Sequence, residues 1–203
     1  MVAEPASFFI SEDEYLRREE ASLTKHEYVN GAIYAMAGAS PSHNDLAAAA
    51  LSALIVQLRG NPCIPRGSDQ RVKVEATGIN TYPDVVIACP PLCYDSKNIT
   101  LLDATVIIEV LSPSTAEYDR TGKFLHLAQL PSLRHYVLIS QDQVWVEHRR
   151  RDGAKWTTEF FASRKDECYL DAINCTLCLA DLYARIDVPS ALDVAPPSDE
   201  KLG

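Results

Sequence analysis

The sequence lacks the features of a membrane or exported protein. No apolar run approaches the ~20 residues that a membrane-spanning helix needs, and residues 1–10 have neither a basic start nor a long apolar segment. We therefore expect a cytoplasmic protein with no membrane contact. Internal repeats are absent as well. The 203 residues, 47% of them apolar, indicate a single domain at residues 1–188, followed by a flexible acidic tail at residues 189–203.

Cysteine is sparse, and no complete metal-binding set of cysteines is present. Because an export signal is missing, we expect the six cysteines to be reduced and buried rather than paired in disulfides. Cys175 and Cys178 have the spacing of a metal-ligand pair, but a structural zinc site needs four ligands. Cys168 can supply a third ligand, and nothing nearby supplies a fourth.

Positive charge is also scarce. The chain has 19 basic and 28 acidic residues, a net charge of −9, and this balance opposes generic binding to nucleic acid. The distribution is uneven, since the tail from Asp187 to Gly203 carries four acids and one lysine. We interpret the one basic stretch as a solvated hairpin; it contains Arg149, Arg150, Arg151, Lys155, Arg164 and Lys165.

Apolar periodicity and turn residues predict an α/β (α+β) chain. The helix at residues 43–59 is apolar nearly all round, so we expect it to be buried on most sides. An Asn30-Gly31 turn predicts a hairpin of two short strands. The other expected helices are residues 12–20, 118–130 and 179–185, and the other expected strands are residues 71–74, 82–89, 104–111, 134–140, 144–150 and 156–161.

The most informative strand contains an acid: Thr105-Val106-Ile107-Ile108-Glu109-Val110-Leu111. It is otherwise apolar, as in strands that are buried on both faces. An ionised carboxylate there costs several kcal/mol unless a cation or good hydrogen bonds compensate it. Glu109 therefore either faces a sheet edge and pairs with Arg or Lys, or it binds a cation.

A second acid, Asp84, leads directly into the strand at residues 82–89. Pro-Asp also marks turns, so Asp84 alone is weak evidence. If the two strands are antiparallel neighbours, however, Asp84 and Glu109 meet. Two close carboxylates repel each other unless a divalent ion joins them, and oxygen ligands suit Mg²⁺ or Mn²⁺ rather than Zn²⁺.

These segments resemble the Uma2 family of restriction-endonuclease-like proteins in the PD-(D/E)-x-K nuclease superfamily. The resemblance extends over roughly residues 11–183. It implies a mixed central sheet flanked by helices, with Asp84 and Glu109 as metal ligands. The matching motifs are Pro83-Asp84, residues 107–115, Tyr118-Asp119-Arg120, Lys123, His26-Glu27-Tyr28-Val29-Asn30-Gly31 and residues 36–44.

One position departs from the superfamily pattern. A lysine is expected two residues after the acid, where this chain has Leu111. In the family the lysine has moved to the following helix, where Lys123 matches, and it can stabilise a hydroxide or a phosphate. The alternative is a surface lysine that neutralises Asp119 or Glu117. Glu27 is expected to complete the metal shell or position water, the alternative being a plain exposed glutamate.

Other residues are candidates for supporting or substrate-binding roles. His43 begins the apolar helix and is either a phosphate-side donor or a capping residue. Asp69 and Arg71 lie in a segment that also resembles the family pattern, and Arg71 either pairs with Asp69 or faces the ligand. Tyr118, Asp119 and Arg120 are expected to fix the start of the helix that delivers Lys123.

The resulting hypothesis is a Mg²⁺- or Mn²⁺-dependent endonuclease that hydrolyses DNA phosphodiester bonds through metal-activated water. Asp84, Glu109 and the carbonyl of Val110 would hold the metal. Two alternatives remain: a non-catalytic binding or scaffold protein that retains the nuclease fold, and a metal-dependent hydrolase of small phosphate esters or nucleotides. A homodimer is expected from the resemblance alone.

Overall fold

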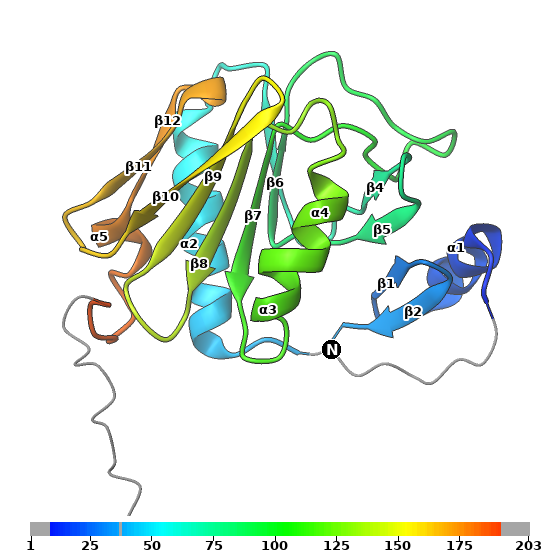
Figure 1. The fold of residues 1–203 in the computed structure, drawn as a ribbon, viewed down its shortest axis with the longest axis horizontal. Helices are drawn as coiled ribbons and strands as arrows, with labels where there is room; N and C mark the ends of the chain where they lie inside the picture. The colour runs from blue at the N-terminus through cyan, green and yellow to red at the C-terminus, as the bar shows by residue number, and fades with distance from the viewer. Residues whose placement is uncertain (1–8, 37, 192–203) are drawn as a thin grey trace, which may run out of the picture.

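The computed structural model describes residues 9–36 and 38–191 (Figure 1). Residues 192–203, which form most of the predicted tail, lie outside this range. Within it, no helix is both long enough and apolar enough to cross a membrane. The elements are α1 (Glu12–Ala21), β1 (His26–Val29), β2 (Ala32–Ala35), α2 (Pro41–Gln57), β3 (Ile64–Gly67), β4 (Val72–Val74), β5 (Ile79–Thr81), β6 (Val85–Ala88), β7 (Val106–Leu111), α3 (Ala116–Tyr118), the π-helical segment η1 (Asp119–Lys123), α4 (Phe124–Leu127), β8 (His135–Ser140), β9 (Val146–Asp152), β10 (Lys155–Phe161), β11 (Glu167–Leu170), the 3₁₀ turn η2 (Asp171–Ile173), β12 (Cys175–Cys178) and α5 (Leu179–Leu182).

The centre of the fold is a six-stranded sheet in the order β10-β9-β8-β7-β6-β3. Strands β7 and β8 are parallel, and the other neighbours are antiparallel. Helix α2 lies against one face, while α3, η1 and α4 lie against the other (Figure 1). The expected mixed central sheet flanked by helices is therefore confirmed.

Strand β7 alternates between two cores on the two faces of this sheet. Val106, Ile108 and Val110 pack into the core that includes α2. Ile107 and Leu111 pack into the opposite core, which includes Leu127 of α4. Because side chains alternate along a strand, Glu109 shares the face of Ile107 and Leu111. Its carboxylate therefore faces the side of the sheet on which η1 lies.

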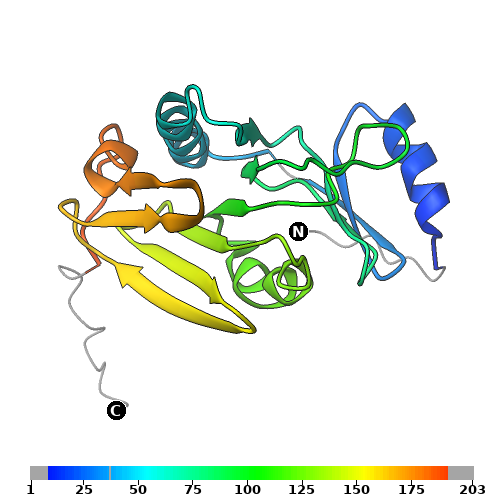
Figure 2. The same ribbon diagram turned by 90° about the horizontal axis from the view of Figure 1, so that it is seen from above.

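A second, four-stranded sheet has the order β2-β1-β5-β4 and packs with α1. Its β1–β2 hairpin turns at Asn30 and Gly31, whose φ angles are 50° and 85°, so the predicted Asn-Gly turn is confirmed. Tyr15 of α1 stacks on Tyr28 of β1, with 5.1 Å between ring centroids. Figure 2 shows α1 at one end of the molecule and the C-terminal elements at the other.

The predicted helix at residues 118–130 is divided into α3, η1 and α4 and ends at Leu127. A π-helical turn forms i→i+5 hydrogen bonds and is common at functional sites. Here the turn begins at Asp119 and ends at Lys123, both of which are buried. Residue composition gives no signal for such a turn, because its stabilisation comes from contacts with the sheet.

Helix α2 is less buried than its sequence predicts. Leu46, Ala50 and Leu54 are buried, whereas Ile55 and Val56 are exposed. The apolar run contains four successive alanines at residues 47–50, and alanine favours helix formation whether or not it is covered. The prediction of burial on most sides is therefore wrong.

The prediction that all six cysteines are reduced is also wrong, since Cys63 and Cys89 form a disulfide. Strand β3 pairs with β6 so that Ile64 lies opposite Ala88, and this register brings together the cysteine before β3 and the cysteine after β6. Strand β3 was not expected because it is short and contains Pro65, which is tolerated on an edge strand. The four other cysteines are free, with Cys168 and Cys175 buried.

Two buried histidines form a hydrogen-bonded pair across strands β8 and β9. Nδ1 of His135 lies 2.8 Å from Nε2 of His148, and the rings stack with 5.0 Å between centroids. Burial, with the neighbouring His148, lowers the pKa of His135 to about 4. Burial also lowers the pKa of His148. Both rings are therefore neutral in the folded protein near neutral pH.

We predict that this pair makes the protein sensitive to mild acid. An unfolded histidine binds a proton below about pH 6.5, whereas folded His135 resists protonation until about pH 4. Between these values the unfolded state binds more protons, so the free energy of unfolding falls as the pH falls. Urea denaturation across this pH range should show that the free energy of unfolding falls less for His148→Gln than for the natural protein. His126→Gln, outside the pair, is the control, and equal losses in all three proteins would contradict the prediction.

Candidate active site

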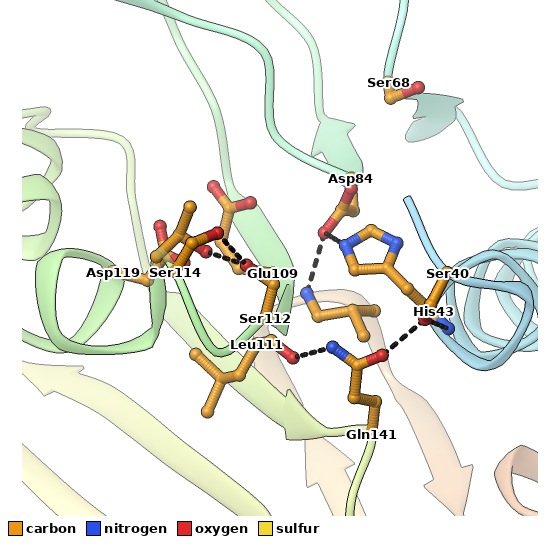
Figure 3. A network of polar contacts seen from close by, with 12 residues as sticks. Ser40, His43, Ser68, Asp84, Glu109, Leu111, Ser112, Ser114, Asp119 and Gln141 are labelled. Atoms are coloured by element: carbon orange, nitrogen blue, oxygen red, sulfur yellow. Dashed lines mark hydrogen bonds and ion pairs between the residues drawn. The ribbon is translucent and has the colours of Figure 1, made fainter. Parts of the chain in front are cut away.

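A cleft of roughly 750 Å³ lies where the start of β6 and the end of β7 meet the four-stranded sheet and the first turn of α2. Six residues named from the sequence line it. Figure 3 shows four of these, His43, Asp84, Glu109 and Asp119, around the ends of the two strands. The six are Glu27, His43, Asp84, Glu109, Asp119 and Lys123.

Asp84 and Glu109 are brought together by the antiparallel pairing of β6 and β7. Val85 lies opposite Ile108, so the residues one step further, Asp84 and Glu109, share a face of the sheet. Oδ2 of Asp84 accepts the backbone N–H of Val110 at 2.7 Å and lies 3.3 Å from Nε2 of His43 (Figure 3). Within the described chain, Oδ1 of Asp84 has no polar partner, so this oxygen is available to a ligand.

Lys123 lies among three carboxylates rather than at the surface. Its Nζ is 2.8 Å from Oε1 of Glu109, 3.0 Å from Oε1 of Glu27 and 3.8 Å from Oδ1 of Asp119. The lysine is 4% exposed. Leu111, which occupies the usual lysine position of the superfamily, is buried in the apolar core on the same face of the sheet. The ammonium beside Glu109 therefore comes from segment η1 and not from strand β7.

Glu27 is also buried, in contrast to the alternative of an exposed glutamate. Its Oε1 accepts hydrogen bonds from the hydroxyl of Thr81 and from the backbone N–H of Tyr82 at 3.3 Å. Both donors lie at the end of β5, which is the neighbour of β1 in the small sheet. The small sheet therefore holds Glu27 in place against Lys123.

The cluster contains more acidic than basic side chains. Burial raises the pKa of Glu109 well above its usual value, and burial likewise raises that of Asp119. Burial acts to lower the pKa of Lys123, but Glu109, Glu27 and Asp119 outweigh it and raise that pKa well above its usual value. The lysine is therefore protonated, and its single ammonium faces three carboxyl groups, two of which, Glu109 and Asp119, hold a proton more readily than usual. A bound cation is one way to balance such a site.

His43 is likewise influenced by an acid. Burial acts to lower its pKa, but the hydrogen bond and charge of Asp84, aided by the Val110 carbonyl, raise it overall. Its Nδ1 is buried without a hydrogen-bond partner among the described residues. His43 therefore favours the protonated form when Asp84 is ionised.

The oxygen donors fit a hard divalent cation, although they do not form a complete cage. Among the described residues, no group of three or more His, Cys, Asp or Glu side chains can hold a metal. Mg²⁺ is commonly bound by only one or two carboxylates and completes its shell with water and phosphate oxygens. Oε1 of Glu109 is buried, and its one partner in the described part of the chain is Lys123, through their ion pair. Asp84, Glu109 and the Val110 carbonyl are therefore a suitable donor set.

Three residues named from the sequence do not line this cleft. Asp69 is exposed and pairs with Lys25, with 3.0 Å between Nζ and Oδ1. Arg71 does not pair with Asp69, because it is buried and donates to Oγ1 of Thr100 at 2.9 Å. Arg120 is directed towards strand β9, where its Nε lies 3.4 Å from Oε2 of Glu147.

Other polar groups at the cleft were given no role in the chemistry from the sequence. The hydroxyl of Ser112 lies 2.8 Å from that of Thr115, and the buried hydroxyl of Tyr118 has no partner in the described chain. Ser40 and Gln141 also line the cleft. The Ser-Pro pair at residues 40–41 does signal a helix start, but nothing local distinguishes Gln141 from any glutamine that follows a strand.

Comparison with known proteins supports this fold. The family model described as "Uma2: Putative restriction endonuclease" matches residues 12–180. Two uncharacterized proteins of Synechocystis sp. are similar to this chain. One is 34% identical over 86% of this chain and 91% of its own length. The other is 36% identical over 69% of this chain and 80% of its own length. A crystal structure of "a putative nuclease belonging to DUF820" from Anabaena variabilis has a TM-score of 0.73 at 20% identity, covering 86% of this chain and 98% of its own. The resemblance inferred from the motifs is confirmed, and the chain belongs to the Uma2 family.

Proposed function

We propose that this protein is a Mg²⁺- or Mn²⁺-dependent endonuclease that hydrolyses DNA phosphodiester bonds. The observation that carries the proposal is the cluster of Lys123, Glu109 and Glu27 beside Asp84 in one cleft. The family model is described as "Putative restriction endonuclease" and the Anabaena protein as "a putative nuclease", and these descriptions support the reaction class. The homodimer and the cytoplasmic location expected from the sequence remain predictions.

In this proposal Asp84, Glu109 and the carbonyl of Val110 hold the cation. When bound, such a cation polarises phosphate oxygens and makes water more acidic. Oδ2 of Asp84 already accepts the N–H of Val110, so Oδ1 is the oxygen that would bind the cation. Glu109 shares its charge between the cation and the ammonium of Lys123.

Lys123 acts as a charged hydrogen-bond donor rather than as a base. Its neighbours raise its pKa well above the usual value, so it keeps its proton at neutral pH. An ammonium has three N–H bonds, and a donor aimed at developing negative charge stabilises the transition state. Glu27, fixed by Thr81 and Tyr82, holds that ammonium in place and accepts a hydrogen bond from the attacking water.

A second candidate is the hydrolysis of nucleotides or small phosphate esters. It is favoured by the charge of the cleft, because each described cation that lines it is paired with an acid: Lys123 with Glu109, His43 with Asp84 and Lys25 with Asp69. A polynucleotide backbone finds few free cations among these residues. Turnover of nucleotides without cleavage of polynucleotides would select this candidate.

We predict that supercoiled plasmid is cleaved in the presence of Mg²⁺ or Mn²⁺ and not in the presence of a chelator. Asp84→Asn and Glu109→Gln should each lower the rate by about 100-fold or more, because each removes a ligand charge from the site. Gel electrophoresis of the plasmid forms measures the rate.

Glu147→Gln is the matched control for this experiment. Glu147 is buried and pairs with Arg149 and Arg120, outside the cleft. The control should retain cleavage. Cleavage that survives unchanged in both Asp84→Asn and Glu109→Gln would remove the basis of the assignment.

We also predict that the protein binds Mn²⁺ without DNA at near-neutral pH. Calorimetric titration should show at least about 10-fold weaker binding for Asp84→Asn, which loses a charged ligand. Lys123→Met should instead bind several-fold more tightly, since the ammonium no longer competes for Glu109. Binding that does not depend on the carboxylates, or no binding at all, would favour a non-catalytic scaffold with the nuclease fold.

A further inference from the structure

Gln141, the residue after strand β8, connects two elements that form the cleft. The side chain is 8% exposed. Its Oε1 accepts the hydroxyl hydrogen of Ser40 at 2.5 Å, and its Nε2 donates to the backbone carbonyl of Leu111 at 2.9 Å (Figure 3). Ser40 is the N-cap of α2, and Leu111 is the last residue of β7. One amide thus ties the start of the helix to the end of the strand that carries Glu109.

The bond from Gln141 also fixes the polarity of the Ser40 hydroxyl. A hydroxyl has one hydrogen to donate and two lone pairs that accept. Because the hydrogen is directed to Gln141, the oxygen is left to accept the backbone N–H of His43 at 3.1 Å. This is the N-cap bond that begins α2. Gln141 is therefore hydrogen-bonded to the N-cap of the first helical turn, which carries His43.

The contacts continue through His43 and close on the same strand. Nε2 of His43 lies 3.3 Å from Oδ2 of Asp84, and this oxygen accepts the N–H of Val110. A ring of polar contacts therefore runs from Leu111 through Gln141, Ser40, His43 and Asp84 to Val110. Its two ends lie on consecutive residues of β7. Such a ring fixes Oδ2 of the Asp84 carboxylate and leaves Oδ1 outside the ring.

We infer that Gln141 is a positioning residue, which fixes His43 against Asp84 and thereby orients the Asp84 carboxylate towards a bound divalent cation. The cation part of this inference rests on the proposed function. Groups that orient metal-binding side chains through hydrogen bonds commonly change metal affinity by about 10–100-fold when they are substituted.

The first test needs no metal. Diethyl pyrocarbonate modifies accessible imidazole nitrogens, and mass spectrometry gives the rate at each histidine. Gln141→Met keeps the length of the side chain but removes both hydrogen bonds, so His43 should react several-fold faster than in the natural protein. Ser40→Ala, at an exposed position, breaks the same ring and should act in the same direction even if Gln141→Met folds poorly.

Gln57→Met is the matched control. Gln57 ends α2 and bridges that helix to β12, with Nε2 donating to the carbonyl of Thr176 and Oε1 accepting its N–H, each at 2.8 Å. The control loses these two hydrogen bonds and one from Nε2 to the carbonyl of Ala53, all at the end of the same helix that is remote from the site. It should leave the reactivity of His43 unchanged. Unchanged His43 reactivity in Gln141→Met and Ser40→Ala would overturn the inference.

The second test measures Mn²⁺ affinity by calorimetry for the same variants. Gln141→Met should bind about 10-fold more weakly, and Gln57→Met should bind like the natural protein. Equal affinity in Gln141→Met and the natural protein would overturn the inference, whatever the reactivity of His43. If the natural protein binds no Mn²⁺, the proposed function and the cation part both fail. His43 reactivity then still decides whether Gln141 positions His43.

Discussion

The ion pairs of the buried Lys123 ammonium hold the candidate site together. They join η1 to Glu109 of the central sheet and to Glu27 of the small sheet. The two sheets that border the cleft are therefore linked through one ammonium group. Each of these groups alone would be costly to bury. Together they offset one another in part, and the excess of acidic over basic side chains makes the cleft suitable for a cation. The stability of the fold and the chemistry of the site are therefore linked.

The geometry around Lys123 follows from the sheet beneath it. Alternation along β7 separates Glu109 from the core that packs on α2 and turns it towards η1. The antiparallel partner β6 places Asp84 beside it. The π-helical turn then begins at Asp119 and ends at Lys123. A local departure from regular helix at a site of buried charge agrees with the general finding that functional sites break local rules.

Much of the fold was predictable because its signals are local. The Asn30-Gly31 turn and the β-branched strands each depend on neighbouring residues. The disulfide between Cys63 and Cys89 was missed because it depends on an edge strand that its own sequence hardly signals. Asp69 and Arg71 were expected near the site because their segment resembles the family pattern. Their side chains, however, pair with Lys25 and Thr100.

The sequence by itself determined that Glu109 lies in a buried strand, that Asp84 begins another, and that Lys123 follows on a helical segment. Periodicity and the cost of burying a carboxylate are enough for these conclusions. Only the tertiary structure decided that Lys123 reaches both Glu109 and Glu27, and that Gln141 links Ser40 to Leu111. These contacts join residues far apart in the chain, and their distances depend on strand register and on helix packing against the sheet. Neither is recorded in any short segment of the sequence.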